Sequence, residues 1–213
     1  PAVPLRRLVV VADDFALSAG ITRGVAAAYK EGIVTSASLL ANAPRWEGAV
    51  STARRLPRLK VGVHLSLVGG EPILDPVRVP SLAPQGGRFR ESWRDFLPPW
   101  LAGRIDREEV RAEWRPQIGR VLASGLQPVH LDSHQHVHHF QKVWQVTADL
   151  TNRFGIKRMR CCKTINDALS KRGLGGMLLN NMAAAHFDLE KNFYTAGLRF
   201  TGNYSIEKIE KEL

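Results

Sequence analysis

Cysteine is nearly absent from this sequence, which contains only Cys161 and Cys162, side by side. Two adjacent cysteines cannot build the multiple-disulfide framework of small secreted domains, and a bridge between direct neighbours is strained. We therefore expect a reducing, cytoplasmic location. The two cysteines are interpreted as buried or half-buried free thiols rather than as a redox pair.

Long apolar runs are also missing. The run at residues 8–12 stops at two aspartates and is too short for the apolar region of a signal peptide. No stretch approaches the roughly 20 apolar residues that a membrane-spanning helix needs. The sequence has no internal repeat, and 44% of its 213 residues are hydrophobic and 23% charged, which is typical of a globular protein. We expect one domain covering residues 1–213.

The chain has no continuous basic stripe, despite a net charge of +10 and a pI near 10.1. Such a charge would attract nucleic acid, acidic substrates or an anionic membrane surface. The basic residues are instead spread as pairs with acids between them and without interleaved aromatics: Arg6-Arg7, Arg54-Arg55, Lys157-Arg158 and Lys171-Arg172. We therefore expect no nucleic-acid partner, and nucleic-acid binding stays an alternative that steep salt dependence would reveal.

Strand-like and helix-like segments alternate along most of the chain. Short apolar runs predict strands at 8–12, 34–41, 60–67, 128–134 and 156–161, and apolar spacing predicts helices at 21–29, 46–56, 106–124, 141–154 and 206–213. Alternation of this kind predicts a parallel sheet in an α/β fold. A complete eight-fold barrel needs about 250 residues, so we expect a distorted or incomplete (β/α) barrel, with an open sheet as the alternative.

Local signals refine these boundaries. Gly32 and Gly125 are expected to end helices in left-handed turns. Asp106 and Glu109 resemble a capping box that starts a helix, which Pro116 could kink. Residues 69–103 are rich in proline and glycine and predict a long loop, whose tryptophans could form a lid or substrate wall.

Residues of the types that can bind metals lie at the ends of three of the predicted strands. Asp13 and Asp14 end the first, His64 lies near the end of the third, and Asp132 and His134 end the fourth. The carboxyl ends of parallel strands share one edge, where α/β active sites form. Each feature has a simpler interpretation, because adjacent aspartates often only cap the next helix and a single histidine is often a core residue.

Five of the seven histidines lie within residues 130–139. In an extended backbone, alternate side chains share a face, so His134, His136 and His138 would point the same way. This cluster predicts a metal site, with a histidine-rich surface turn as the alternative. One carboxylate and two imidazoles leave open positions on a divalent ion, as catalysis requires. A second carboxylate could accept a proton from a bound water, so adjacent aspartates offer both a ligand and a base.

These motifs resemble the YdjC-like carbohydrate deacetylase family, whose best-known type removes acetyl groups from chitin oligosaccharides. The resemblance rests on residues 11–18 (VADDFALS), 32–39 (GIVTSASL), 62–65 (GVHL) and 130–138 (HLDSHQHVH), which follow one another in family order. Ala16 replaces the glycine that is more usual after Phe15.

The resemblance implies a distorted (β/α) barrel and metal-dependent hydrolysis of an acetyl group from an N-acetylated sugar. The ion is commonly magnesium, and the ligands would also suit zinc. Asp14, His64 and His134 match the family's metal ligands, and Asp13 matches its general base. Further candidates for substrate contact or for protonation of the leaving amine are Asp132, His136, His138 and Arg160.

Several alternatives stay open at this point. The substrate could be a free chito-oligosaccharide or the sugar head of a glycolipid, and a homo-oligomer would be compatible with the sequence. Family members usually carry a further C-terminal segment with a His-Pro motif at the active-site rim. This chain ends at Leu213 without it, so we expect either a truncated sequence or a member that lacks the segment. A non-catalytic metal-binding or carbohydrate-binding relative is the alternative function.

Overall fold

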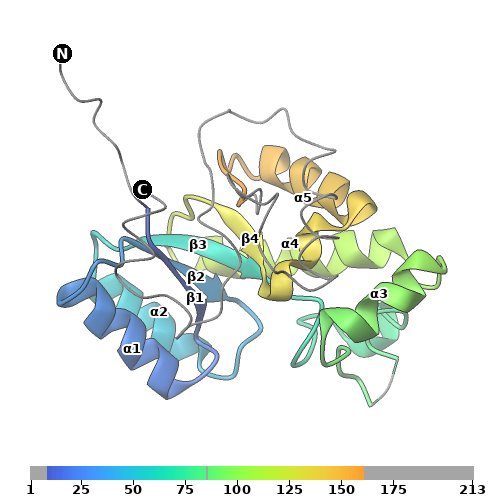
Figure 1. The fold of residues 1–213 in the computed structure, drawn as a ribbon, viewed down its shortest axis with the longest axis horizontal. Helices are drawn as coiled ribbons and strands as arrows, with labels where there is room; N and C mark the ends of the chain where they lie inside the picture. The colour runs from blue at the N-terminus through green and yellow to red at the C-terminus, as the bar shows by residue number, and fades with distance from the viewer. Residues whose placement is uncertain (1–8, 85, 161–213) are drawn as a thin grey trace, which may run out of the picture.

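The computed structural model describes residues 9–84 and 86–160, which form a parallel β-sheet flanked by helices (Figure 1). The sheet in this part of the chain has the order β1-β2-β3-β4. Its strands are β1 (Val11–Phe15), β2 (Ser36–Leu40), β3 (Lys60–Leu65) and β4 (Leu131–Ser133). The α/β prediction is confirmed, whereas the distorted (β/α) barrel stays a prediction.

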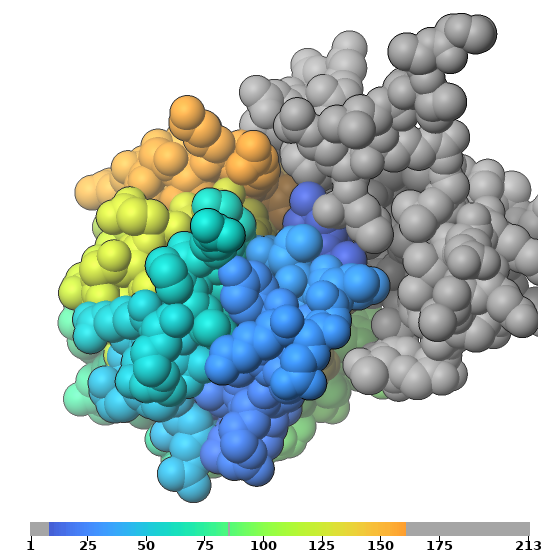
Figure 2. Space-filling model, turned by 90° about the vertical axis from the view of Figure 1, so that its left-hand side faces the viewer, coloured from blue at the N-terminus to red at the C-terminus, as the bar shows by residue number. Residues whose placement is uncertain are grey.

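Helices connect the parallel strands, as the need for crossovers requires. They are α1 (Ala19–Lys30), α2 (Trp46–Arg55), α3 (Trp93–Leu101), α4 (Arg107–Ala123) and α5 (Gln141–Arg153), with short 3-10 helices η1 (Pro76–Arg78) and η2 (His134–His139). The helices α1 and α2 pack together at the β1 side, and α4 packs on α5 and β3 (Figure 1). Figure 2 looks onto α1 and α2, which form a continuous surface in blue and light blue.

The register of the sheet brings polar residues together inside an otherwise apolar core. His64 on β3 lies directly opposite Asp132 on β4, and Leu40 on β2 lies opposite His64. The pairing of β1 with β2 shifts between Ala12 and Phe15, the stretch that contains the two aspartates. Since both neighbours of β3 are strands, His64 is held from two sides.

The segment from 69 to 103 is not one long loop, and that prediction is wrong. It contains η1 and the nine-residue helix α3, despite Pro98 and Pro99 within α3. Phe96 and Trp100 recur at helical spacing and are buried, with their rings 5.8 Å apart. Burial of these two aromatic rings outweighs the backbone hydrogen bonds that the prolines cannot make.

Other boundaries differ in smaller ways. Asp106 does cap α4, but Glu109 binds the backbone and hydroxyl of Ser81 instead of closing a capping box. Gly125 has the expected left-handed φ of 81°. Gly32 does not; a Cβ there would lie 2.8 Å from the carbonyl oxygen of Ala28, so close packing requires this glycine.

The end of the described chain is more irregular than expected. Strand β4 covers three residues, and the predicted strand at 156–161 is reduced to one bridge between Leu131 and Met159. The cysteines and the helix predicted at 206–213 lie outside the described residues. Within the described ranges, no helix is both long and apolar enough to cross a bilayer.

Candidate active site

Three predicted metal ligands meet at the carboxyl edge of the sheet. Oδ1 of Asp14 lies 2.7 Å from Nδ1 of His134 and 3.4 Å from Nε2 of His64. The ligand atoms of all three residues lie within 4.8 Å of one another. Asp14 lies within β1, next to its last residue, because this strand runs three residues further than predicted; His64 is the residue before the end of β3, and His134 begins η2. Residues far apart in sequence are thus brought together by the shared strand edge.

These separations fit a shared divalent ion. Ligands bound at about 2.0–2.1 Å to one ion lie roughly 2.8–3.0 Å apart in octahedral geometry and roughly 3.3–3.4 Å apart in tetrahedral geometry. The distances from Asp14 to the two histidines lie close to these ranges. A second group, formed by Asp13, His64 and Asp132, is also close enough. In this group, however, both oxygens of Asp13 accept hydrogen bonds from Arg160, and Oδ2 of Asp132 forms an ion pair with it. The first group is therefore the better candidate to hold an ion.

Mutual contacts control the protonation of these ligands. Burial alone would lower the pKa of His64, but the carboxylates of Asp132 and Asp14 outweigh burial and raise it to about 10. Burial alone would raise the pKa of Asp14, but contacts with His134 and His64 hold it well below its usual range. His64 without an ion is thus protonated near neutral pH, and a metal would have to displace that proton.

The backbone around the site adopts unusual conformations. Asp14 and Ala16 have φ values of 59° and 88°, and Gln135 and His136 have values of 50° and 57°. Left-handed backbone costs a residue other than glycine about 1–2 kcal/mol. These four are the non-glycine residues with positive φ in the described ranges, so the strain is concentrated at this edge of the sheet.

Asp132 organises the layer beneath the ligands. Its fully buried carboxylate accepts hydrogen bonds from His64 Nδ1 at 2.7 Å and from the Ser38 hydroxyl at 2.7 Å, and it forms an ion pair with Arg160 at 3.0 Å. Because Nδ1 of His64 is used in this way, Nε2 is the ring atom that faces Asp14. Carboxylates that orient metal-binding histidines in this manner are common partners of metal sites.

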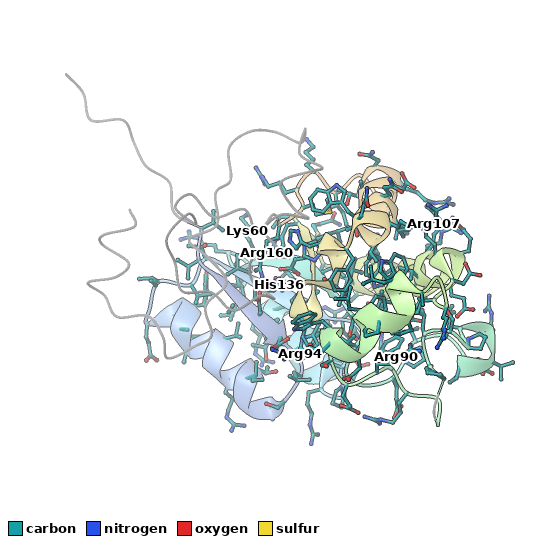
Figure 3. The ribbon with its side chains drawn as sticks, turned by 45° about the vertical axis from the view of Figure 1, so that its right-hand side comes forward. Lys60, Arg90, Arg94, Arg107, His136 and Arg160 are labelled. Atoms are coloured by element: carbon teal, nitrogen blue, oxygen red, sulfur yellow. The ribbon has the colours of Figure 1, made fainter. Side chains whose placement is uncertain are left out.

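Arg160 joins the second aspartate of the motif to this layer. Its two Nη atoms each donate to one oxygen of Asp13, both at 2.7 Å, and Nη2 also lies 3.0 Å from Asp132. Asp13 is 37% exposed, so its carboxylate is oriented from one side and accessible from the other. Figure 3 shows Arg160 beside His136, whose pKa is lowered to about 4 by burial and by the charge of Arg160.

His138 is oriented away from the candidate metal ligands. Its ring is fully buried, lying 2.6 Å from the Ser133 hydroxyl and 3.0 Å from the carbonyl of Arg160. Burial lowers the pKa of His138 to about 3, so the neutral ring donates from Nε2 to Arg160 and accepts from Ser133 at Nδ1. The His138 ring therefore holds the backbone carbonyl of Arg160 in place through this hydrogen bond.

The structure tests the predicted arrangement of the histidine cluster and of the two aspartates. The extended arrangement of residues 134–138 is wrong, because η2 turns sharply where Gln135 and His136 have left-handed backbones. A histidine-rich surface turn is wrong as well, since His138 and His139 are buried. Ser18, rather than either aspartate, caps α1. His64 proves to be both a buried core histidine and a member of the candidate site.

Sequence reasoning did not identify Ser38 and His130 as parts of the site. Ser38 uses its one hydroxyl proton on Asp132 and accepts a hydrogen bond from Nε2 of His130 at 3.0 Å. The ring of His130 lies against β3 at Gly62, where a Cβ would lie 2.2 Å from Nε2. The glycine in the motif at 62–65 was the signal that a neighbouring side chain needs this space.

Trp100, one of the two tryptophans predicted to form a lid or substrate wall, is buried in the core.

Comparison with known proteins places this arrangement in a family. The model of the family described as YdjC-like protein matches residues 7–212. A carbohydrate deacetylase of Brevibacillus brevis is 39% identical over 150 residues, which are 70% of this chain and 57% of that protein. A carbohydrate deacetylase of Oceanobacillus iheyensis is 38% identical over 163 residues, covering 76% and 67% respectively.

A solved structure agrees with this relationship. The crystal structure of an Enterococcus faecalis V583 protein, described as a cellobiose-phosphate cleavage protein, superimposes with a TM-score of 0.66 at 33% identity. The match covers 74% of this chain and 59% of that one. The chain thus spans 57% to 67% of the length of these three relatives. On the family match and these identities, the chain belongs to the YdjC-like protein family.

Proposed function

We propose that this protein is a metal-dependent carbohydrate N-deacetylase, which hydrolyses the acetamide of an N-acetylated sugar to an amine and acetate. The observation that carries the proposal is the meeting of Asp14, His64 and His134 around one point, with Asp13 oriented beside them by Arg160. The names of the two relatives, both carbohydrate deacetylases, support the same chemistry.

The three proposed ligands suit magnesium, our first candidate, and also zinc, which imidazoles favour. A divalent ion bound by them would polarise the acetamide carbonyl and make a bound water more acidic. Asp13 would act as the general base, because its carboxylate is partly exposed and held in one orientation by two hydrogen bonds from Arg160.

The remaining candidates have supporting roles in this proposal. Asp132 orients His64, and Arg160 orients Asp13. His138 acts one step further away, since it holds the backbone of Arg160. His136 lies beside Arg160 and has a lowered pKa, so at neutral pH it would contact the substrate as a neutral hydrogen-bonding group. A neutral imidazole is a weak proton donor, which makes hydrogen bonding to the leaving nitrogen its more suitable role.

The test combines acetate release with elemental analysis. Asp13→Asn should lose at least 100-fold in turnover, the lower end of about 10²–10⁴ for a general base, while keeping the ion. His134→Ala should lose the ion itself. Asp149→Asn is the matched control, because Asp149 is exposed on α5 and forms a surface ion pair with Arg111. Wild-type acetate release in Asp13→Asn, or a full complement of metal in His134→Ala, would refute the assignment.

A further inference from the structure

Trp93 differs from the other tryptophans of the chain in its exposure. The sequence contains five tryptophans, and Trp46, Trp100, Trp114 and Trp144 are all buried. Trp93 is only partly buried. The guanidinium of its exposed neighbour Arg94 lies over the Trp93 ring, 4.9 Å from its centre, and so covers one of the two indole faces. An indole that keeps access to solvent at the start of a helix is available to a ligand.

The position of Trp93 follows from the packing of α3. Phe96 and Trp100 are buried on the inner side of this helix, and Phe96 stacks on Phe140 just after η2, with ring centres 5.9 Å apart. Trp93 precedes Phe96 by three residues and so lies on the same side of the helix, one turn closer to its N-terminus. It therefore extends the apolar stripe beyond the core toward η2.

Gln135 ties this end of α3 to the candidate metal ligand. Its side-chain oxygen accepts a hydrogen bond from the Trp93 backbone at 2.8 Å, and its nitrogen donates to the Glu91 carbonyl at 3.3 Å. Gln135 directly follows His134 and has a strained, left-handed backbone. The α3 N-terminus has no cap from Ser92, so Gln135 supplies the acceptor that this helix end needs.

A second connection reaches His134 from the other side. The backbone nitrogen of Gly69 donates to the carbonyl of Arg90, and a Cβ at Gly69 would lie 3.6 Å from Nε2 of His134. Residues 90–93 are thus joined to Gly69 at one end and to Gln135 at the other. Both contacts border His134, so the backbone of residues 90–93 lies beside this candidate ligand. Figure 3 shows Arg94 at the η2 end of α3.

We propose that Trp93 is a carbohydrate-stacking platform for the sugar unit next to the one that is deacetylated, and that Gln135 is the positioning residue that places it. This inference rests on the proposed function and adds a subsite to it. The apolar face of a pyranose packs well on an indole face, which presents a negative quadrupole to the ring's C–H groups. Arg94 covers one face of Trp93, so the sugar would stack on the opposite face, and the guanidinium could donate to hydroxyls at the sugar's edge.

The experiment compares N-acetylglucosamine with its β-1,4-linked dimer as substrates. Trp93→Ala should raise KM for the dimer about tenfold, in line with the loss of one aromatic contact, and leave KM for the monomer and both kcat values unchanged. Trp93→Tyr should restore most of the affinity. Leu101→Ala, also exposed on α3, is the control. An unchanged KM for the dimer, or an equal loss for both substrates, would overturn the proposal.

Fluorescence provides a readout that does not depend on turnover. Binding of the dimer should change the emission of the wild-type protein and leave that of Trp93→Phe unchanged, because the other four indoles are buried. Gln135→Ala should weaken dimer binding as Trp93→Ala does, and Gln135→Glu, which keeps an acceptor for Trp93, should weaken it less. If wild type binds the dimer through Trp93 but releases no acetate, the subsite stands and the deacetylase assignment fails. If it releases acetate and Trp93→Phe shows the wild-type emission change, the subsite fails alone.

Discussion

Asp132 gives the sharpest test of how the site is built, through the substitution Asp132→Asn. The native carboxylate accepts on both oxygens, one facing His64 and the other facing Ser38 and Arg160. An asparagine of the same shape has one acceptor and one donor. If its nitrogen faces His64, Nδ1 must become an acceptor, and the ring proton moves to Nε2, the atom that faces Asp14. If the asparagine nitrogen instead faces Arg160, its N–H groups meet the N–H groups of the guanidinium, and two donors face each other in a fully buried space.

The magnitude follows from these contacts. Removing one partner of a buried ion pair costs about 3–5 kcal/mol when the other charge is left alone. Arg160 keeps its two bonds to Asp13, and His64 keeps its contact with Asp14. Neither charge is therefore left alone, and the expected loss lies nearer the cost of one unsatisfied buried group, about 1–3 kcal/mol. Loss of the carboxylate that orients a metal-binding histidine typically weakens metal affinity about 10- to 100-fold.

Two measurements check this prediction. Guanidinium unfolding of the metal-free protein gives the change in stability, and calorimetric titration with zinc or magnesium gives the change in affinity. Ser38→Ala is the matched comparison, because it removes one hydrogen bond from the same carboxylate and leaves the charge and His64 in place; we expect about 1 kcal/mol of destabilisation and nearly unchanged metal affinity. Wild-type affinity in Asp132→Asn would refute the idea that Asp132 orients His64 as a ligand.

Three further predictions concern the scaffold. Burial raises the pKa of Glu113, and hydrogen bonds from Gln117 and two backbone N–H groups only partly offset this effect. The folded state therefore binds the Glu113 proton more tightly than the unfolded state, so stability should fall as pH rises from about 4.5 through the raised pKa. Glu113→Gln should abolish this fall in melting temperatures measured across pH. Gly62→Ala should destabilise by about 1–3 kcal/mol, because its Cβ would meet the His130 ring at 2.2 Å; no recovery of stability in Gly62→Ala with His130→Ala would contradict this explanation. Ala16→Gly should relieve about 1–2 kcal/mol of strain, because φ at this position is 88°. This gain is offset by about 0.5–1 kcal/mol of added chain entropy and about 0.8 kcal/mol for the buried methyl group, so stability should stay within about 1 kcal/mol of wild type. A loss of about 2 kcal/mol or more, as expected when a buried methyl is removed without relief of strain, would count against strain at this turn.

The sequence by itself determined the α/β class and most of the strands, because strand and helix periods are local properties of the chain. It also placed Asp13, Asp14, His64, Asp132 and His134 at one edge, since parallel strands end at one edge whatever the details of their packing. The choice of Asp14, His64 and His134 as the ligands rests on the family resemblance. The long loop was wrong because prolines are strong local signals, and only the burial of Phe96 and Trp100 shows that α3 forms in spite of them.

Tertiary structure alone decided how the site is supported. Asp13 and Arg160 are separated by 147 positions, and Ser38 and Asp132 by 94, so neither pairing leaves a local pattern. The left-handed turn at Gln135 and His136 likewise comes with a contact from outside η2, the bond from Trp93 to Gln135. Metal-ligand residue types can be recognised one at a time, whereas the groups that orient them are defined by the register between strands and by buried charges that need partners.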